Sequence, residues 1–528
     1  MNKLFFTDKY FKKYENDILE LSNSWNFKTL NIFFINIGID SSIDQDIIIS
    51  YTSDWSNIPD GYADILVRPK STNECAIILK ICDSCEIPIT ISAGRTNLTG
   101  SATPFGGLIL STKNLISPEV KVDIKNKTVL TPVGLELEKM RKEVIKQSNK
   151  KLYYPVNPTS RNDAYVGGTI SCNASGFIPG DKGATRYWVD EITLILINGF
   201  SSRIKRGKYK SKNGEFIIDC NGKLIKIEVS KYKRPKIKNA SGPYSIFKEE
   251  IDFIDLIVGS EGIFGLITMS KFKLAYKPKE FLDLFIILEK EKEAIELHEF
   301  LFNYFNKDLS QLNALEYFGH NCQNYMKHND YFFKNKNDIA VYLQFPIHKG
   351  SLEQSIEDWI CILTKFKPKI NLDNIISLND KINFDKFFES RHSIPDNALT
   401  KTKQIGGISI ITDTIVPIQN FKNYLEKIHY KLQNKKIEYI LFGHLGDCHL
   451  HFHLIPRKDQ EKEAIEIYNY MIDLCTNMEG IYSAEHGTGK RKRIDFEKCY
   501  GKKAVKMLKK TKKGFDPKNL LNIGNIIN

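Results

Sequence analysis

The chain has 528 residues, of which 42% are hydrophobic and 26% are charged, a composition typical of a soluble globular protein. Its length predicts about two or three domains, each with its own core. No apolar run reaches the roughly 18 residues that a membrane-spanning helix needs, and the first residues, MNKLFFTDKYFKKYEND, resemble neither a secretory signal nor a transit peptide. We therefore expect a cytoplasmic protein, with peripheral attachment to the inner face of the membrane left open.

The formal net charge of +13 permits contact with nucleic acid or an anionic membrane. The lysines are dispersed, however, and are densest at 503–513, where apolar residues recur at helical spacing. That pattern favours a solvated helix face, so we expect no nucleic-acid partner. The ten cysteines are scattered, which favours reduced thiols. Cys82 and Cys85 form a CxxC inside a helical pattern, and no second pair at zinc spacing accompanies them.

Strand and helix patterns alternate after an N-terminal segment, residues 1–50. They predict a βαβ-type unit followed by a further strand, with a strand from residue 64, a helix at 71–85, a strand at 87–92 and a strand at 106–112. Residues 200–250 are rich in lysine and weakly periodic, which indicates an insertion with hairpins. We place the first large domain at 51–275.

Three glycine-rich segments connect apolar runs of this domain: AGRTNLTG (93–100), PVNPTSRNDAYVGGTISCNASG (155–176) and GSEGIFGLIT (259–268). Glycine allows backbone N–H groups to approach a phosphate closely. None of the segments is a GxGxxG with an acidic residue about 20 positions later, so a nicotinamide site is not supported. Their order and spacing indicate a site for a flavin or nucleotide pyrophosphate.

The second large domain, 276–500, shows a different pattern. Strand and helix signals alternate from residue 281, beginning with FLDLFIILE and EAIELHEFLFNYF, and predict an α+β domain with an antiparallel sheet. The segment EYILFGHLGDCHLHFHLIP (438–456) is typical of a hairpin. The tail, 501–528, contains FDPKNLLNIGNII and is too apolar to remain undocked, so we expect it to pack back on the first domain.

Two motifs in the second domain carry chemistry, GHLGDCHLHFH (443–453) and SAEHGTGK (483–490). His444 and His451 flank a Gly-Asp turn that can aim both imidazoles at one point, and Glu485 can add an anionic ligand while leaving a coordination position open. His486 is then available as a base, because the unperturbed pKa of histidine is near neutrality.

Two other interpretations of these motifs need weighing. Alternation of histidine with apolar residues over 449–454 also fits a half-buried strand with a polar face of histidine. With eleven histidines in the chain, however, the concentration of four in one motif favours a metal site. The GTGK sequence is similar to the end of a P-loop, but Ala484 replaces its first glycine and Arg491 replaces the residue that holds magnesium, which excludes that motif.

The ordered motifs resemble a known family. The three glycine-rich segments are similar to the flavin loops of FAD-linked oxidases with the vanillyl-alcohol-oxidase fold. GHLGDCHLH, SAEHGTG and FDPKNLLN resemble the C-terminal half of the subgroup containing D-lactate dehydrogenase, the glycolate oxidase FAD subunit and D-2-hydroxyglutarate dehydrogenase. The resemblance covers about residues 50–528. It implies an α+β fold with a two-part FAD-binding domain and an antiparallel-sheet substrate (cap) domain.

The resemblance implies roles for individual positions in this sequence. The cofactor would be FAD, held without a covalent bond because the first loop has no histidine to tether it. The implied cofactor-binding positions are Gly94, Arg95, Thr96, Asn97, Gly100, Pro158, Ser160, Gly167, Gly168, Asn173, Gly176, Glu261, Gly262, Ile267 and Asn522, with Glu261, Gly262 and Ile267 on the adenine side.

The same resemblance assigns the second domain. It implies that His444, His451 and Glu485 hold a divalent metal, zinc or manganese, that His486 is the active-site base, and that Arg391 grips the substrate carboxylate. Three positions depart from the family pattern. His449 replaces an asparagine, Ile523 replaces a proline, and the segment ISIITD lacks the lysine of 2-hydroxyglutarate-specific members, which weakens the case for a dicarboxylate substrate.

These features predict an enzyme that oxidises a D-2-hydroxy acid, such as D-lactate or glycolate, to the 2-oxo acid by hydride transfer to flavin N5. An electron acceptor must then reoxidise the flavin, and the sequence does not distinguish among a quinone, an electron-transfer flavoprotein, a cytochrome and oxygen. It also leaves open whether the protein forms a homodimer. The alternative is a non-redox FAD enzyme like alkylglycerone-phosphate synthase, which we expect to lack the pair His444 and His451 with Glu485.

Overall fold

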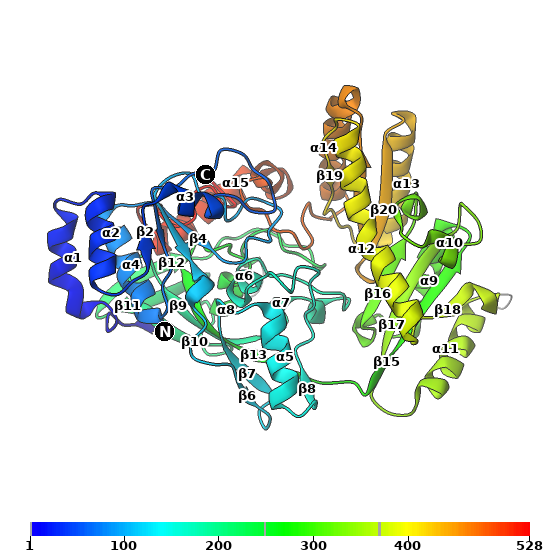
Figure 1. Cartoon of the computed structure of the whole chain (residues 1–528), viewed down its shortest axis with the longest axis horizontal. Coiled ribbons are helices and arrows are strands. Elements are labelled where there is room, and N and C mark those ends of the chain that lie inside the picture. The colour runs from blue at the N-terminus through cyan, green and yellow to red at the C-terminus, as the bar shows by residue number, and fades with distance from the viewer. Residues whose placement is uncertain (1–2, 248–249, 368–370) are drawn as a thin grey trace.

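The computed structural model describes residues 3–247, 250–367 and 371–528, and its ribbon divides into two lobes (Figure 1). The first lobe contains the described chain up to β14 (Ala275–Tyr276), and the second begins with β15 (Glu280–Leu288). The last helix, α15 (Arg493–Phe515), returns to the first lobe. The exact domain boundaries stay predictions, although the two largest hydrophobic cores divide the chain along similar lines.

The predicted βαβ-type unit is present in a four-stranded sheet of the first lobe. Helix α4 (Thr72–Cys85) begins after Ser71, whose hydroxyl accepts a hydrogen bond from the Glu74 backbone N–H, and ends at Glu86 in a left-handed conformation. β3 and β4 both pair in parallel with β5, so α4 crosses over within one sheet. The strand order is β2 (Ser41–Ser42), β3 (Ile65–Val67), β5 (Leu108–Ser111) and β4 (Ile89–Ser92).

Further sheets complete the first lobe. A five-stranded sheet has the order β10 (Ser201–Lys205), β9 (Val189–Ile195), β13 (Leu266–Lys273), β7 (Thr128–Pro132) and β6 (Lys121–Asp123), and β14 pairs with β8 (Leu152–Tyr153). A third sheet joins β1 (Leu4–Phe6) to a hairpin of β11 (Glu215–Cys220) and β12 (Lys223–Glu228). The lysine-rich segment 200–250 thus contains a hairpin.

Short helices pack around these sheets. They are α1 (Glu15–Ser22), α2 (Phe27–Asn36), α3 (Gln45–Ile48), α5 (Leu137–Gln147), α6 (Val166–Ser171), α7 (Thr185–Trp188) and α8 (Phe253–Ile257). Within the described ranges, none of the helices of either lobe combines the length and apolar character needed to cross a bilayer.

The second lobe is built on an antiparallel sheet, as the sequence predicts. Its strand order is β18 (Ile375–Ser377), β15, β17 (Ile339–Ile347), β16 (Ala314–Phe318), β20 (Glu438–His444), β21 (His449–Ile455) and β19 (Ile410–Ile411). Successive side chains of a strand point to opposite faces. In β15, Leu284 and Ile286 therefore enter one core, whereas Phe285 and Ile287 enter the other.

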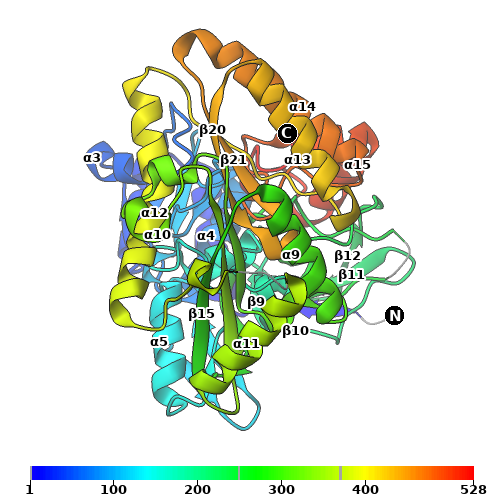
Figure 2. The same ribbon diagram turned by 90° about the vertical axis from the view of Figure 1, so that its right-hand side faces the viewer.

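Helices cover both faces of this sheet. One face packs against α9 (Glu291–Tyr304), α11 (Leu352–Phe366), α13 (Ile418–Asn434) and α14 (Glu461–Asn477). The other face packs against α10 (Asn329–Phe332) and α12 (Lys381–Gln404). Figure 2 shows α12 on the opposite side of the sheet from α9 and α11.

The C-terminal tail packs against the first lobe. Leu520, Leu521 and Ile526 belong to the core of that lobe, and Leu521 forms a parallel bridge with Ile89 at the start of β4. The Asn522 side chain continues this contact, because its Oδ1 accepts a hydrogen bond of 2.7 Å from the Ile91 backbone N–H. The last residues are therefore part of the first lobe's structure.

Candidate functional site

A cavity of about 650 Å³ is lined by both lobes. All three glycine-rich segments of the first lobe contribute to its wall, together with β16, α12 and the β20–β21 hairpin of the second lobe and the segment 483–489 between the lobes. Every predicted cofactor position lines the cavity except Gly100 and Asn173. The predicted metal ligands, His486 and Arg391 line it as well.

The two exceptions have structural roles. Gly100 has a φ of +80°, a left-handed conformation that favours glycine, and a Cβ there would also lie 2.1 Å from the Ile58 Cδ1. The buried Asn173 side chain accepts a hydrogen bond of 2.9 Å from the Arg186 backbone N–H. Both residues lie outside the residues that line the cavity, and their assignment as cofactor-binding positions stays a prediction.

Two glycines that do line the cavity differ in what surrounds them. A Cβ on Gly94 would lie 2.1 Å from the Asp163 carbonyl oxygen, so this glycine allows two loops to meet. A Cβ on Gly168 would meet a single protein atom within 4 Å, the Ala93 Cβ at 3.2 Å. Its remaining surroundings belong to the cavity, as expected where a ligand approaches the backbone.

The β20–β21 hairpin positions the histidines. It pairs His444 with His449 next to the turn, and the two-residue period of β21 places His449, His451 and His453 on the face opposite Leu450 and Phe452. The interpretation as a half-buried strand is wrong, because all residues of β21 are buried. The histidine face is turned toward the cavity and the segment 483–489.

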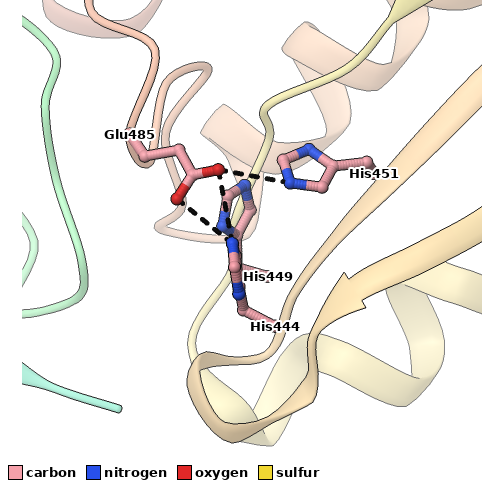
Figure 3. Close-up of side chains that lie close together, drawn as sticks. All are labelled: His444, His449, His451 and Glu485. Carbon is pink, nitrogen blue, oxygen red and sulfur yellow. Dashed lines mark hydrogen bonds and ion pairs between the residues drawn. The ribbon is translucent and has the colours of Figure 1, made fainter. Parts of the chain in front are cut away.

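Three side chains predicted as metal ligands converge in Figure 3. The Nε2 atoms of His444 and His451 each lie 3.3 Å from a different carboxylate oxygen of Glu485. His449 lies beside them, and one potential ligand atom from each of the four residues falls within 4.8 Å of the others. The donor set of imidazole and carboxylate suits zinc or manganese.

The outer nitrogens of the two predicted ligands have partners. His444 Nδ1 lies 2.7 Å from Glu316 Oε1, and His451 Nδ1 lies 2.9 Å from the Thr412 carbonyl oxygen. Each Nδ1–H can donate to these acceptors, so that in the neutral form of each ring the Nε2 lone pair would face Glu485. This arrangement, with the outer nitrogen held by an oxygen, is the one that metal-binding histidines use.

Charges at the site are strongly coupled. Burial lowers the pKa of His444, but the negative charges of Glu316 and Glu485 outweigh it and raise this pKa to about 9. Burial raises the pKa of Glu485, but Lys238 and His444 hold it well below its usual range. A cation bound between the Nε2 atoms would displace the His444 proton.

The segment 483–489 is held by two buried carboxylates. Asp413 accepts hydrogen bonds from the backbone N–H groups of Glu485 and His486, at 3.2 and 2.9 Å. Glu261 accepts them from Thr488 and Gly489, both at 2.7 Å. Glu261 lines the cavity, and its carboxylate holds this segment; its assignment to the adenine side of the cofactor stays a prediction.

His486 stacks on His451, with ring centroids 5.4 Å apart. Its Nδ1 lies 3.6 Å from Asp413 Oδ2, and its Nε2 lies 3.7 Å from Glu485 Oε1. Burial lowers the pKa of His486 to about 4, despite the opposing charge of Asp413. The ring is therefore neutral at pH 7 and can accept a proton.

Arg391 extends from α12 toward the same cluster. Its Nη2 lies 2.8 Å from Glu316 Oε2, so one carboxylate contacts both Arg391 and His444. The guanidinium also lies over the ring of Phe177, a residue of the first lobe, at 4.4 Å. Arg391 is thus fixed at the boundary between the lobes and has further N–H groups to offer.

The lysine-rich segment 200–250 reaches the site through Lys238. The Lys238 side chain is 3% exposed, and its Nζ lies 3.0 Å from Glu485 Oε2 and 3.6 Å from Asp447 Oδ2. Asp447 in turn accepts a hydrogen bond from the Gly180 backbone N–H. Lys238 therefore neutralises two carboxylates where the segment, the hairpin turn and the first lobe meet.

Sequence reasoning did not identify Glu316, Asp413 or Lys238 as site residues. Glu316 lies in the strand ALEYF, where it is 2% exposed. A charged residue in the middle of an otherwise apolar strand is unusual, and this signal could have identified it from the sequence. Asp413 is isolated in an apolar segment in the same way. Nothing distinguishes Lys238 from the other lysines around it.

Comparison with known proteins identifies the family. A model of an FAD binding domain matches residues 63–203, and a model of the C-terminal domain of FAD linked oxidases matches residues 312–526. The chain belongs to the FAD-linked oxidases. The two matched regions contain the glycine-rich segments up to 176, and the cluster of His444, His451, Glu485 and His486, respectively.

Relatives in this family match nearly the whole chain. It is 24% identical to a D-lactate dehydrogenase of Archaeoglobus fulgidus, over 88% of this chain and 91% of the relative. It is 25% identical to glycolate oxidase subunit GlcD of Bacillus subtilis, over 90% and 91%. It is 22% identical to a D-2-hydroxyglutarate dehydrogenase of Stutzerimonas stutzeri, over 92% and 95%.

Solved structures confirm the predicted fold. p-Cresol methylhydroxylase aligns with a TM-score of 0.66 at 14% identity, over 97% of each chain. An alkyldihydroxyacetonephosphate synthase aligns with a TM-score of 0.63 at 15% identity, over 94% of this chain and 83% of the other. These likenesses establish the fold of the vanillyl-alcohol-oxidase type, with an FAD-binding and a cap domain.

The buried position of Lys238 generates a stability prediction. Lys238→Met removes the buried cation that contacts both Glu485 and Asp447, and leaves Glu485 with His444 and Asp447 with the Gly180 N–H. We expect the free energy of unfolding to fall by about 3–5 kcal/mol. Lys233→Met is the matched control, because Lys233 and its partner Glu479 have side chains 63% and 64% exposed, and should cost less than about 1 kcal/mol. Urea unfolding of chelator-treated protein measures both, and equal losses would contradict the role assigned to Lys238.

Proposed function

We propose that this FAD-linked oxidase oxidises a D-2-hydroxy acid to the corresponding 2-oxo acid. The observation that carries the proposal is the convergence of His444, His451 and Glu485 at the cavity wall, with Arg391 and His486 lining the same cavity. A cation-binding cluster, a fixed guanidinium and a neutral imidazole are the groups needed to bind a 2-hydroxy carboxylate and take its hydroxyl proton. The names of the relatives agree with this reaction class.

The first lobe fits FAD. The cavity extends along all three glycine-rich segments, and the space beside Gly168 allows a ligand to reach the backbone. Residues 93–97, 158–168 and 261–267 would hold the cofactor, without a covalent bond because no histidine lies in the segment 93–100. Bound FAD would supply the acceptor for the hydride leaving the substrate C2.

The second lobe fits a divalent cation. The Nε2 atoms of His444 and His451 and the carboxylate of Glu485 would be its ligands, while Glu316 and the Thr412 carbonyl hold the imidazole orientations. The cation, zinc or manganese in this proposal, would supply Lewis acidity to the substrate hydroxyl. Arg391 would hold the substrate carboxylate with N–H groups that Glu316 does not use.

Proton transfer would use His486. Its neutral ring can take the hydroxyl proton at Nε2, which faces the Glu485 side of the cluster. Asp413, 3.6 Å from Nδ1, would stabilise the imidazolium that forms. The reduced flavin would then pass its electrons to an acceptor. The candidates are a quinone, an electron-transfer flavoprotein, a cytochrome and oxygen.

The cavity favours a substrate with one carboxylate. Among the described cap residues that line the cavity, Arg391 carries the one guanidinium, and none is a lysine. Asp396, Leu399 and Ile411 line the cavity as well, beside the neutral or weakly basic groups of Ser409, His392 and His453. A second substrate carboxylate would therefore find no second guanidinium or ammonium group among these cap residues. D-Lactate, glycolate or a similar acid therefore fits better than a dicarboxylate.

Anaerobic flavin reduction tests the proposal directly. Mixing the FAD-loaded protein with D-lactate or glycolate should bleach the oxidised flavin, and L-lactate, the control of inverted configuration, should bleach it far more slowly. D-2-Hydroxyglutarate should be a poorer substrate than either. If no 2-hydroxy acid bleaches a correctly loaded flavin, the proposal is wrong, and non-redox chemistry of the alkylglycerone-phosphate-synthase kind becomes the better candidate.

Two substitutions separate the proposed metal ligand from the proposed base. His444→Ala should lower bound metal and weaken substrate binding. His486→Ala should retain metal and FAD but slow flavin reduction by roughly 10²–10⁴-fold, the usual contribution of a general base. Elemental analysis and anaerobic stopped-flow measure the two effects. Full metal content in His444→Ala, or wild-type flavin reduction in His486→Ala, would show that the site is drawn incorrectly.

Gly168→Val tests the proposed contact between FAD and the second glycine-rich segment. The new side chain would enter the cavity, so the variant should purify with much less FAD while remaining folded. Acid precipitation followed by absorbance of the supernatant measures the FAD load, and it should release all flavin from the wild-type protein if the bond is non-covalent. A Gly168→Val protein with stoichiometric FAD would refute the cradle, and yellow colour left in the wild-type pellet would refute non-covalent binding.

A further inference from the structure

His449 is a third imidazole beside the predicted metal ligands. The register of the β20–β21 hairpin places it opposite His444, and cross-strand partners project from the same face of a sheet. His451, two residues further along β21, projects from that face as well. The His449 ring consequently lies 4.6 Å from the His451 ring and 5.5 Å from the His444 ring, measured between centroids (Figure 3). The hairpin therefore turns three imidazoles toward the carboxylate of Glu485.

The His449 side chain is buried without a hydrogen bond. It is 0% exposed, and neither of its ring nitrogens has a hydrogen-bond partner among the described residues. A buried polar group of this kind is costly unless a ligand satisfies it. His453, the next histidine on the same face, differs from it, because His453 Nε2 lies 2.8 Å from the Ser409 hydroxyl oxygen.

The nearby carboxylate of Asp413 does not account for the buried imidazole. Asp413 Oδ1 lies 3.1 Å from His449 Nε2, but outside hydrogen-bond geometry. Two backbone N–H groups of the segment 483–489 already donate to this carboxylate. The Ser483 hydroxyl donates to it too, and Lys492 Nζ lies 3.2 Å from it. The charge of Asp413 is therefore compensated without His449.

We propose that His449 is a fourth protein ligand of the cation, an inference that rests on the cation site of the proposed function. One ring nitrogen of His449 lies within 4.8 Å of the potential ligand atoms of His444, His451 and Glu485. Bonds of about 2.0–2.2 Å to one zinc ion then require only small rotations of these side chains. Zinc can expand from four ligands to five, so four protein ligands still leave a position for the substrate hydroxyl.

A third imidazole also changes which metal the site prefers. Imidazole nitrogen suits zinc and other late first-row metals, whereas manganese suits oxygen ligands and lies at the weak end of the affinity order. With His449 as a ligand, the donor set consists of three imidazoles and one carboxylate. The site is therefore selective for zinc over manganese, a choice that His444, His451 and Glu485 alone leave open.

Cobalt substitution in the FAD-loaded full chain counts the imidazole ligands. Bound Co²⁺ shifts the N–H proton of each coordinated imidazole far outside the ordinary range of the proton NMR spectrum. The wild-type protein should show three such solvent-exchangeable signals, and His449→Asn should show two. Asparagine is the residue that His449 replaces in the family pattern, so the variant should fold. His453→Asn, the matched control on the same strand face, should keep three signals.

The count separates the inference from the proposed function. Two signals in the wild type that persist in His449→Asn would overturn the role of His449 and leave the proposed cation in place. A wild-type protein that binds no cobalt, while a 2-hydroxy acid still bleaches its flavin, would overturn both the cation and its fourth ligand.

Metal affinity gives a second, independent measurement. In competition with a chelator, His449→Asn should bind zinc at least about 10-fold more weakly than the wild type, the smallest effect usual even for residues that only contact a ligand. Its affinity for manganese should fall by less, and His453→Asn should change neither affinity by this amount. Unchanged zinc affinity in a folded His449→Asn protein, or equal losses for the two metals, would show that His449 is not a ligand.

Discussion

Two buried carboxylates, one from each lobe, fix the segment on which the site depends. Asp413 of the second lobe and Glu261 of the first accept backbone N–H groups from the same short segment. Unpaired charges at such depth are costly, and these charges are compensated by hydrogen bonds and, at Asp413, by Lys492 at 3.2 Å. The side chains of Glu485 and His486 are thereby positioned relative to both lobes at once.

The charge pattern compensates the buried carboxylates of the cluster. Glu485 faces Lys238 on one side and His444 on the other. Glu316 likewise lies between His444 and Arg391. Each carboxylate has a positive partner, so none is buried uncompensated. The proposed cation would replace the His444 proton and leave the Lys238 and Arg391 contacts in place.

The sequence predicts secondary structure and local motifs better than it predicts contacts between residues far apart in the chain. The βαβ-type unit, the antiparallel cap sheet and the histidine hairpin follow from periodicity and turn residues, and the ordered motifs lead to the family. Glu316, Asp413 and Lys238 were missed because their importance arises from strand pairing and lobe packing. The register of β16 with β20 brings Glu316 beside His444, and no pattern within ALEYF specifies that register. Gly100 and Asn173 do not line the cavity, and in sequence a glycine that a loop conformation requires cannot be distinguished from one that a ligand requires.

The C-terminal part of the chain connects the two lobes a second time. After α14 the chain leaves the cap, passes through the segment 483–489 and ends against β4. Asn522 donates to the Glu261 carbonyl oxygen and accepts from Ile91, so it connects the third glycine-rich segment to the strand before the first. The residue that holds the segment of Glu485 and His486 is therefore itself held by the C-terminal residues. The tail thus adds a second covalent connection between the lobes to the one between β14 and β15, so the hydrogen bonds across the boundary do not align the two walls of the cavity alone.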